Sequence, residues 1–275
     1  MEKLKLENEI TEEPLTQEQA IDLQVEASNN AEGNLPFINC ELCKNRGYIY
    51  FKSNYNGLFV LKSKACECKK KRDMLQKAQD NGLGQYIDKR MKDFEAWNET
   101  AKTIKAKGIE FCKNHSDDQC WFMIIGQSGC GKTLMGSIIC NHLLLNKNKN
   151  VLYTTWTDLM TKVKLQNMAQ ETKSSLNILS AVKEAEVLFL DECLKEYTPT
   201  EIRYLSEIIN YRYTNNLKTI ITSEFMMKDL LQIEESVFGR IFEKCDYGKE
   251  LIEVKKDMKS NYRLKELTKQ WKSEL

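Results

Sequence analysis

Eight consecutive residues carry the strongest chemical signal in the chain. They are Gly126, Gln127, Ser128, Gly129, Cys130, Gly131, Lys132 and Thr133. The segment matches the pattern G-x-x-x-x-G-K-[ST] in full. Its glycines would let successive backbone N–H groups point at a phosphate chain, and a following helix would add partial positive charge. Lys132 would reach the β- and γ-phosphates and the Thr133 hydroxyl would ligate Mg²⁺, so the pattern predicts a P-loop for ATP and Mg²⁺.

Two acidic residues follow a later apolar run. Residues 187–190 are apolar, and Asp191 and Glu192 come directly after them. Asp191 is expected to hold Mg²⁺ and Glu192 to polarise the attacking water, because phosphoryl transfer depends mainly on positioning and charge stabilisation. A strand that ends in an exposed acidic turn is the alternative. The complete P-loop upstream favours the catalytic interpretation.

Further polar positions could complete such a site. The apolar run 219–221 ends in Thr222 and Ser223, either of which could contact the attacking water or the γ-phosphate. Arg240 could reach a neighbouring subunit's nucleotide as an arginine finger, with a surface arginine on a helix as the alternative. Arg263 is the weaker candidate of the two arginines.

Four cysteines in two close pairs offer a different chemistry. Cys40 and Cys43 form one pair, Cys66 and Cys68 form the other, and 22 residues lie between the pairs. Four thiolates satisfy tetrahedral Zn²⁺ at a closed structural site, and metal would supply much of the folding energy of so small a segment. Free thiols or a redox pair are the alternatives. The six scattered cysteines are expected mostly as small core side chains.

The elements that would position these residues alternate between strands and helices. Helical patterns separate four apolar runs, at residues 121–125, 151–153, 187–190 and 219–221. This alternation predicts an α/β fold in which helices cover both faces of a parallel sheet. Thr198, Pro199 and Glu201 together predict a helix start, because they supply a cap, a first-turn proline and a capping-box acid.

The chain is expected to divide into four parts. The P-loop ATPase domain occupies residues 119–275, and a basic helical linker with a break at Gly82 and Gly84 precedes it. The whole order is a flexible or helical acidic arm at 1–36, a zinc-binding module at 37–72, the linker at 73–118 and the ATPase domain at 119–275. Within the module, residues 48–51 and 58–61 are expected to form two strands around a turn at 54–57.

Composition points to a cytoplasmic protein with a substantial core. The 275 residues are 41% hydrophobic and 29% charged, with a net charge of +1. No run approaches the ~18 apolar residues of a membrane span, and the first residues lack the pattern of a signal peptide. Lys69, Lys70, Lys71 and Arg72 could contact DNA phosphates or, equally, an acidic partner surface. His115, His142 and Trp156 are expected to be packed side chains without a role in binding.

Together the motifs resemble bacterial and phage helicase loaders of the DnaC/DnaI type, AAA+ ATPases related to the IstB transposition helpers. The resemblance runs from about residue 37 to 265 and includes both cysteine pairs and the region of Asp93 and Phe94. The P-loop and the acidic strand end are shared by a very large class of proteins. The cysteine pattern upstream of them is more specific and resembles phage-borne loaders.

The resemblance implies a function. ATP would bind between subunits of a self-associating AAA+ domain, with Arg240 reaching a neighbour's site. The zinc module would hold a hexameric replicative helicase of the DnaB type, which would be placed on single-stranded DNA, with ATP binding and hydrolysis timing release. The alternatives are an IstB-like ATPase that assists a transposase and a nucleotide-binding adaptor without catalysis. The zinc module favours the loader over the first, and Glu192 argues against the second.

Overall fold

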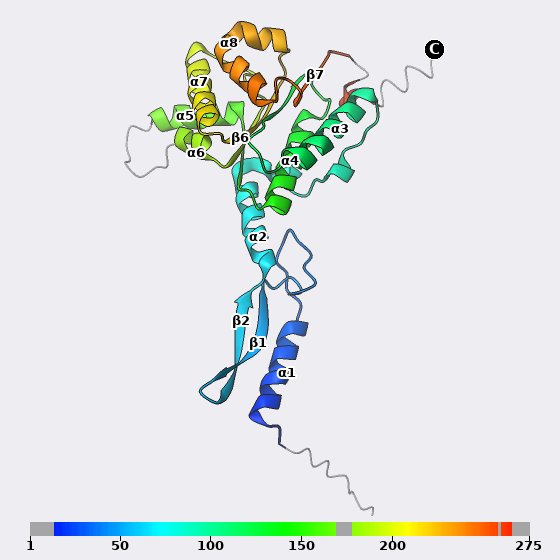
Figure 1. Cartoon of the computed structure of the whole chain (residues 1–275), viewed down its shortest axis with the longest axis vertical. Coiled ribbons are helices and arrows are strands. Elements are labelled where there is room, and N and C mark those ends of the chain that lie inside the picture. The colour runs from blue at the N-terminus through cyan, green and yellow to red at the C-terminus, as the bar shows by residue number, and fades with distance from the viewer. Residues whose placement is uncertain (1–13, 169–177, 258–259, 266–275) are drawn as a thin grey trace, which may run out of the picture. The chain divides into compact units, whose positions relative to one another are not determined.

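The computed structural model describes residues 14–168, 178–257 and 260–265 (Figure 1). It divides into two compact units, residues 1–72 and residues 73–275. The finer predicted divisions, after residues 36 and 118, stay predictions.

The first unit contains a helix and a β-hairpin. Helix α1 (Gln17–Asn30) begins with a capping box formed by Thr16 and Gln19. Strands β1 (Tyr48–Tyr55) and β2 (Leu58–Ala65) pair in antiparallel register and are longer than the apolar runs predicted. Asn56 and Gly57, with φ angles of 51° and 87°, make the turn between them. Positive φ at both positions matches the right-handed twist of the hairpin.

Helix α1 is attached to the hairpin by side-chain contacts. The Asn29 amide donates to the Tyr50 carbonyl at 2.8 Å and accepts from the Tyr50 N–H at 3.0 Å. The Lys52 ammonium lies 2.8 Å from the carboxylates of Glu18 and Asp22. Residues 17–30 of the predicted acidic arm are therefore a helix, and residues 1–13 lie outside the described residues.

The second unit is built on a parallel sheet of five strands. The strands are β3 (Phe122–Gly126), β4 (Val151–Thr155), β5 (Val187–Asp191), β6 (Lys218–Ser223) and β7 (Leu251–Val254). Their spatial order is β4-β5-β6-β3-β7, and every neighbouring pair is parallel. All residues of β3, β5 and β6 are buried, which confirms the predicted α/β fold.

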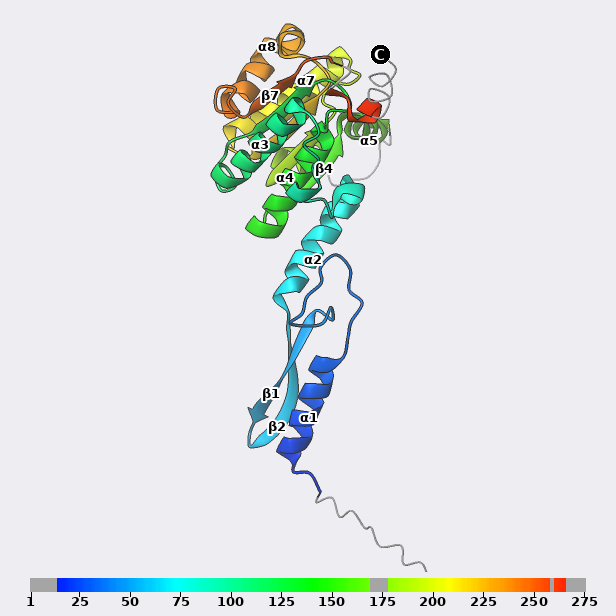
Figure 2. The ribbon, with the colours of Figure 1, turned by 90° about the vertical axis from the view of Figure 1, so that its right-hand side faces the viewer.

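Helices cover both faces of this sheet (Figures 1 and 2). On one face, Phe111 of α3 (Glu99–Asn114) packs on Phe122 at 4.9 Å between ring centroids, and α4 (Lys132–Lys147) contacts β5 and β6. The core on the other face joins α5 (Trp156–Met168), α6 (Ile178–Glu184), α7 (Pro199–Thr214) and α8 (Met227–Lys244). Helix α7 begins at the predicted Thr198 cap. None of the described helices is long and apolar enough to cross a membrane.

A helix and short turns occupy the stretch predicted as a linker. Helix α2 (Glu67–Ala78) leads into the π-turn η1 (Gln79–Leu83) and the 3-10 turns η2 (Gly84–Tyr86) and η3 (Met91–Asp93). The predicted glycine break falls in η1 and η2, where Gly82 has a φ of 96°. A last 3-10 turn, η5 (Tyr262–Leu264), ends the described chain.

Arg212 on α7 is fully buried, and its hydrogen bonds connect α7 to the end of α6 and to strand β6. Its guanidinium donates to the Thr219 hydroxyl and to four carbonyl oxygens, those of Val182, Lys183, Ala185 and Lys218. Burial lowers its pKa to about 9. The charge is accepted in the core because each of the three guanidinium nitrogens donates to at least one oxygen.

Replacing Arg212 with methionine should lower the free energy of unfolding by about 3 kcal/mol, because four carbonyls, two of them in fully buried bonds, would lose their donor. Chemical denaturation of the second unit would measure the loss. Arg203→Met is the matched control, since Arg203 is exposed on the same helix and should change stability little. Equal midpoints for the two variants would contradict a structural role for Arg212.

Candidate functional site

The P-loop joins β3 to α4 through glycines that no other residue could replace. Gly126, Gly129 and Gly131 have φ angles of 97°, 73° and 95°. A Cβ on Gly126 would lie 2.1 Å from the Val254 carbonyl oxygen, and one on Gly129 would lie 2.1 Å from the Asn261 side-chain oxygen. Helix α4 begins directly after Gly131, so its free N–H groups lie at the loop.

Lys132 is buried beneath this loop. Its ammonium donates to the carbonyls of Gly126 at 2.9 Å and Gln127 at 2.8 Å. Burial lowers its pKa from the ordinary 10.5, and nearby acids oppose that shift. Two neutral carbonyls compensate a buried cation only in part, so the site favours an anion such as a phosphate.

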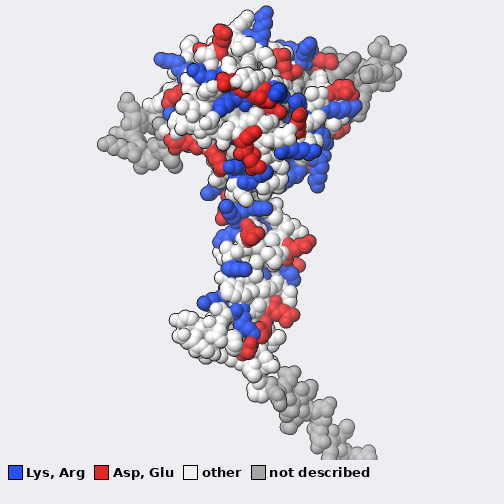
Figure 3. Space-filling model, in the orientation of Figure 1, with Lys and Arg blue, Asp and Glu red and all other residues white. Residues whose placement is uncertain are grey.

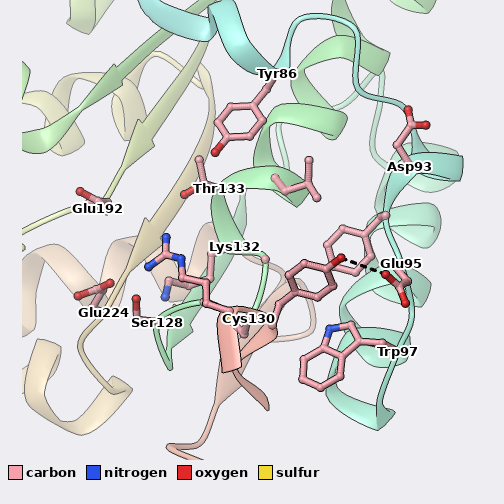
Figure 4. A pocket seen from close by; sticks show the side chains of 16 residues that line it. Tyr86, Asp93, Glu95, Trp97, Ser128, Cys130, Lys132, Thr133, Glu192 and Glu224 are labelled. Carbon is pink, nitrogen blue, oxygen red and sulfur yellow. Dashed lines mark hydrogen bonds between the residues drawn. The ribbon is translucent and has the colours of Figure 1, made fainter. Parts of the chain in front are cut away.

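A cavity of about 360 Å³ opens beside the P-loop (Figure 4). The loop residues from Ser128 onwards line one part of it, together with Glu192 and Glu224. Four aromatic side chains also line it, together with Asp93, Glu95 and Arg263; they are Tyr86, Phe94, Trp97 and Tyr262. These four side chains are called the aromatic wall below. The loop could bind the phosphates of a nucleotide while the base stacks on one of the aromatic rings.

Asp191 accepts hydrogen bonds from three hydroxyl groups at the end of β5. Thr133 donates to Oδ1 at 3.1 Å, Thr222 donates to the same oxygen, and Tyr153 donates to Oδ2 at 3.0 Å. Burial raises the pKa of Asp191, and the three hydroxyls oppose that shift. The predicted magnesium pair, Thr133 and Asp191, therefore lies together.

Glu192 lines the cavity from a strained position. Its φ angle is 52°, in the left-handed region that residues other than glycine seldom adopt. Backbone strain of this kind is common at functional sites. Its carboxylate pairs with the exposed Lys195 at 3.1 Å. Its backbone N–H donates to the Thr222 hydroxyl at 3.0 Å. The Thr222 hydroxyl thus connects the two acidic residues.

Ser223 has a different environment from Thr222. Both residues are buried and neither is among the residues that line the cavity, but the Ser223 hydroxyl donates to the Cys193 carbonyl at 2.8 Å, whereas that of Thr222 donates to Asp191. These contacts connect Ser223 to the backbone that follows Asp191.

Thr222→Val should keep nucleotide affinity and slow turnover by about tenfold to a hundredfold, because it removes a bond to each acid while preserving shape. Steady-state hydrolysis and equilibrium nucleotide binding would separate the two effects. Thr219→Val is the control, since Thr219 lies on the same strand and bonds Arg212 instead. Unchanged turnover in Thr222→Val would exclude the positioning role.

The two candidate arginines occupy different places. Arg263 lines the cavity of its own chain, although its sequence signal is the weaker. Arg240 lies on α8, where its guanidinium is 5.9 Å from the Tyr213 ring and donates to the Ser236 carbonyl at 3.1 Å. It is not among the cavity residues, so a role for Arg240 requires the site of another subunit.

The aromatic wall is the part of the cavity that the sequence did not predict. Tyr262 is fixed by its N–H, which donates to the Gly129 carbonyl at 2.8 Å, and by its hydroxyl, which donates to Glu95 at 3.1 Å. Its ring meets that of Trp97 edge-on at 5.9 Å. The only signal was the match of Asp93 and Phe94 to the loader pattern, which gave Phe94 no role.

The four clustered cysteines form a separate site in the first unit. The Sγ atoms of Cys40, Cys43, Cys66 and Cys68 all lie within 4.8 Å of one another. The Cys40–Cys66 separation is 3.8 Å and the Cys43–Cys68 separation is 3.5 Å. Tetrahedral Zn²⁺ with Zn–S bonds of about 2.3 Å requires sulfurs about 3.8 Å apart. The donor set and its spacing therefore fit zinc.

Thiol acidity differs within the cluster. Burial opposes ionisation of Cys43, but the Gly47 N–H at 3.3 Å and the neighbouring thiols lower its pKa to about 6. Burial raises the pKa of Cys68 to about 12. A bound metal would deprotonate all of its thiol ligands.

One predicted DNA contact is wrong. Arg72 is buried, and its guanidinium donates to the carbonyls of Leu35, Pro36 and Ile38 and to Asn45 at 2.8 Å. It holds the cysteine-bearing loop together and cannot reach a phosphate outside. The Lys69 ammonium lies 4.4 Å from the centre of the Tyr48 ring, while Lys70 and Lys71 are exposed.

The expected bystanders are packed as predicted. Trp156 is fully buried and its indole N–H donates to the Glu196 carbonyl at 3.2 Å. His115 bonds Asp118 at 2.6 Å, and His142 bonds Asn146 at 2.9 Å. Of the six scattered cysteines, Cys130, Cys140, Cys193 and Cys245 are buried and two are half-buried.

Comparisons with known proteins agree with this geometry. Residues 122–235 match the AAA domain (dynein-related subfamily). The phage-like element PBSX protein XkdC of Bacillus subtilis is 25% identical over 238 residues, covering 80% of this chain and 85% of XkdC. The replicative helicase loader DnaC of Buchnera aphidicola is 27% identical over 125 residues, which cover 46% of this chain and only 49% of that loader.

A solved structure shares the fold. The crystal structure of the DnaC helicase loader superposes with a TM-score of 0.50 at 20% identity, covering 62% of this chain and 98% of that one. Residues 122–235 are therefore similar to an AAA domain, and the chain is similar to a phage-element protein and to a DnaC-type replicative helicase loader.

Proposed function

We propose that this protein is an ATP-dependent loader that binds a hexameric replicative helicase and places it on single-stranded DNA. The observation that carries the proposal is a nucleotide site in which Lys132 and Glu192 line one cavity and Asp191 bonds the cavity residue Thr133, in a chain similar to a protein named as a replicative helicase loader. ATP binding and hydrolysis would time the release of the helicase. We place this activity in the cytoplasm of a bacterial host.

The residues of the cavity divide the work of hydrolysis. Lys132 and the loop N–H groups would bind the phosphates, and Thr133 and Asp191 would hold Mg²⁺. Magnesium would neutralise charge that develops on the phosphate oxygens. Glu192 would accept a proton from the attacking water, since its carboxylate lines the cavity and makes its ion pair with an exposed lysine.

Self-association would complete the site. Arg240 is half-exposed on α8 and lies outside the cavity of its own chain. Its guanidinium is oriented by the Tyr213 ring, so it could be presented to the nucleotide of a neighbouring subunit. Arg263 would contact the nucleotide within the same chain.

The first unit would provide the surface that holds the helicase. The hairpin tip, residues 53–61, carries no charge and remains white on the face shown in Figure 3. Tyr55 is 64% exposed and Leu58 is 57% exposed at this tip. Exposed apolar side chains gathered in this way favour a protein partner. The exposed Lys70 and Lys71 remain as contacts for single-stranded DNA or for acidic groups of the partner.

Glu192→Gln tests the enzymatic part of the proposal. The variant should bind ATP as tightly as the parent chain and hydrolyse it about a hundred times more slowly, because the amide cannot accept the proton. Phosphate release and nucleotide binding would be measured together. Glu196→Gln is a control outside the cavity lining. Equal turnover in Glu192→Gln and the parent chain would favour a nucleotide-binding adaptor.

Co-purification tests the partner. The chain would be mixed with the host's replicative helicase, with and without ATP, and analysed by size-exclusion chromatography with light scattering. A nucleotide-dependent complex of defined mass is expected, and Tyr55→Ser combined with Leu58→Ser should weaken it. No complex with the helicase, together with a complex with a transposase on DNA, would replace the loader by the IstB-like alternative.

A further inference from the structure

Tyr153 places a hydroxyl beside Asp191, the proposed magnesium ligand. It lies on β4, a strand in which the sequence predicted no site residue. In the register of β4 and β5, Tyr153 pairs with Phe189 and Thr155 pairs with Asp191. The Tyr153 ring packs edge-on against Phe189 at 5.1 Å, and its hydroxyl donates to Asp191 Oδ2 at 3.0 Å. Thr133 and Thr222 both bond the other oxygen, Oδ1. Among these three donors, Tyr153 alone fixes Oδ2.

The ring of Tyr153 also contacts the turn η1. Gly82 lies so close that a Cβ on it would be 3.1 Å from Tyr153 Cδ1. The φ angle of Gly82 is 96°, so a larger residue would be strained as well as crowded. The turn therefore packs directly against the Tyr153 ring.

The residues that follow η1 are hydrogen-bonded to helix α4. Asn141 of α4 is fully buried, and its side-chain amide donates to the carbonyls of Tyr86 at 2.7 Å and Lys89 at 2.9 Å. Tyr86 in turn lines the cavity (Figure 4).

We propose that Tyr153 is a positioning residue for Asp191 and that the turn around Gly82 controls it. Displacement of η1 would shift the ring, release Oδ2 and weaken the hold of Asp191 on magnesium. Partners of a metal ligand commonly change metal affinity by tenfold to a hundredfold when they are lost. The inference rests on the proposed nucleotide site and adds a residue and a segment through which that site would be regulated.

Magnesium-dependent nucleotide binding tests the inference without hydrolysis. The full chain would be titrated with a fluorescent ATP analogue in EDTA and then at increasing Mg²⁺ concentrations. Tyr153→Phe keeps the ring and removes only the hydroxyl. It should leave the Kd in EDTA unchanged and raise the half-saturating Mg²⁺ concentration about tenfold. A purely structural role would instead alter the Kd in both buffers together with the Tm.

Two glycine variants test the part played by the turn. Gly82→Ala should raise the Mg²⁺ requirement in the same direction, and adding it to Tyr153→Phe should raise the requirement no further. Gly84→Ala is the matched control, since a Cβ there would meet only Gln79 Cγ, at 3.8 Å.

The possible outcomes distinguish failure of the role of Tyr153 from failure of the proposed nucleotide site. Identical Mg²⁺ curves for Tyr153→Phe and the parent chain would overturn the positioning role, and identical curves for Gly82→Ala and Gly84→Ala would overturn control by the turn. A parent chain that failed to bind the analogue in either buffer would remove the nucleotide site itself.

Discussion

Lys132→Ala is expected to abolish nucleotide binding, with a loss of at least a hundredfold in affinity. The ammonium is the cation buried beneath the loop, and its two present partners are neutral carbonyls that cannot replace a phosphate. Isothermal titration with ATP and Mg²⁺ would measure the loss. The stabilisation that ATP gives to the parent chain in a thermal melt should vanish in the variant.

The same substitution should leave the ligand-free fold at least as stable. The pKa of Lys132 in the folded chain lies below the ordinary 10.5, so carrying its charge at neutral pH opposes folding. Alanine removes that cost, and the zinc content of the first unit should remain that of the parent. Retained ATP affinity in a folded Lys132→Ala chain would contradict the P-loop assignment.

Cys43→Ser should release zinc and unfold the first unit around the cluster. Zinc bound to four thiolates contributes on the order of 10 kcal/mol to the folding of a small domain, far more than its few apolar contacts provide. Cys43 is fully buried and accepts the Gly47 N–H, so its thiol belongs to the interior of the cluster. Metal analysis and the amide protection of residues 37–72 would report the change.

Chelation of the parent chain should reproduce this loss, while ATP binding by the second unit should persist in both cases. Cys112→Ser is the matched control, because Cys112 lies outside the cluster and is half-buried in the second unit. A Cys43→Ser chain that kept its zinc and its helicase complex would exclude the metal site.

Local motifs allowed the chemistry and most of the sheet to be predicted. The P-loop, the acids after β5 and the Thr198 cap are each specified by adjacent residues whose local geometry follows from residue type. The strand β7 was missed because it has only four residues, two of them buried, and so short a run gives no clear apolar pattern. Such a strand is recognised only once its neighbour β3 is in place.

The remaining parts of the site depend on contacts across long sequence separations. Tyr262 reaches the P-loop through a backbone bond to Gly129, and Tyr153 reaches Asp191 across 38 residues. Nothing in the residues around either tyrosine indicates these partners. Arg72 was predicted as an exposed contact because it ends a run of basic residues. In the fold its side chain is buried instead, where it donates to four acceptors that are distant in sequence.

The positive φ angle of Glu192 has a consequence for how this sequence can evolve. Asparagine and glycine occupy the left-handed region more easily than glutamate, so either would relieve backbone strain of about 1 kcal/mol at this position. Selection for stability alone would therefore favour asparagine or glycine at this position. Lineages that depend on the proposed role of Glu192 in hydrolysis should retain glutamate here, whereas descendants that only need to hold ATP should accumulate asparagine or glycine at residue 192.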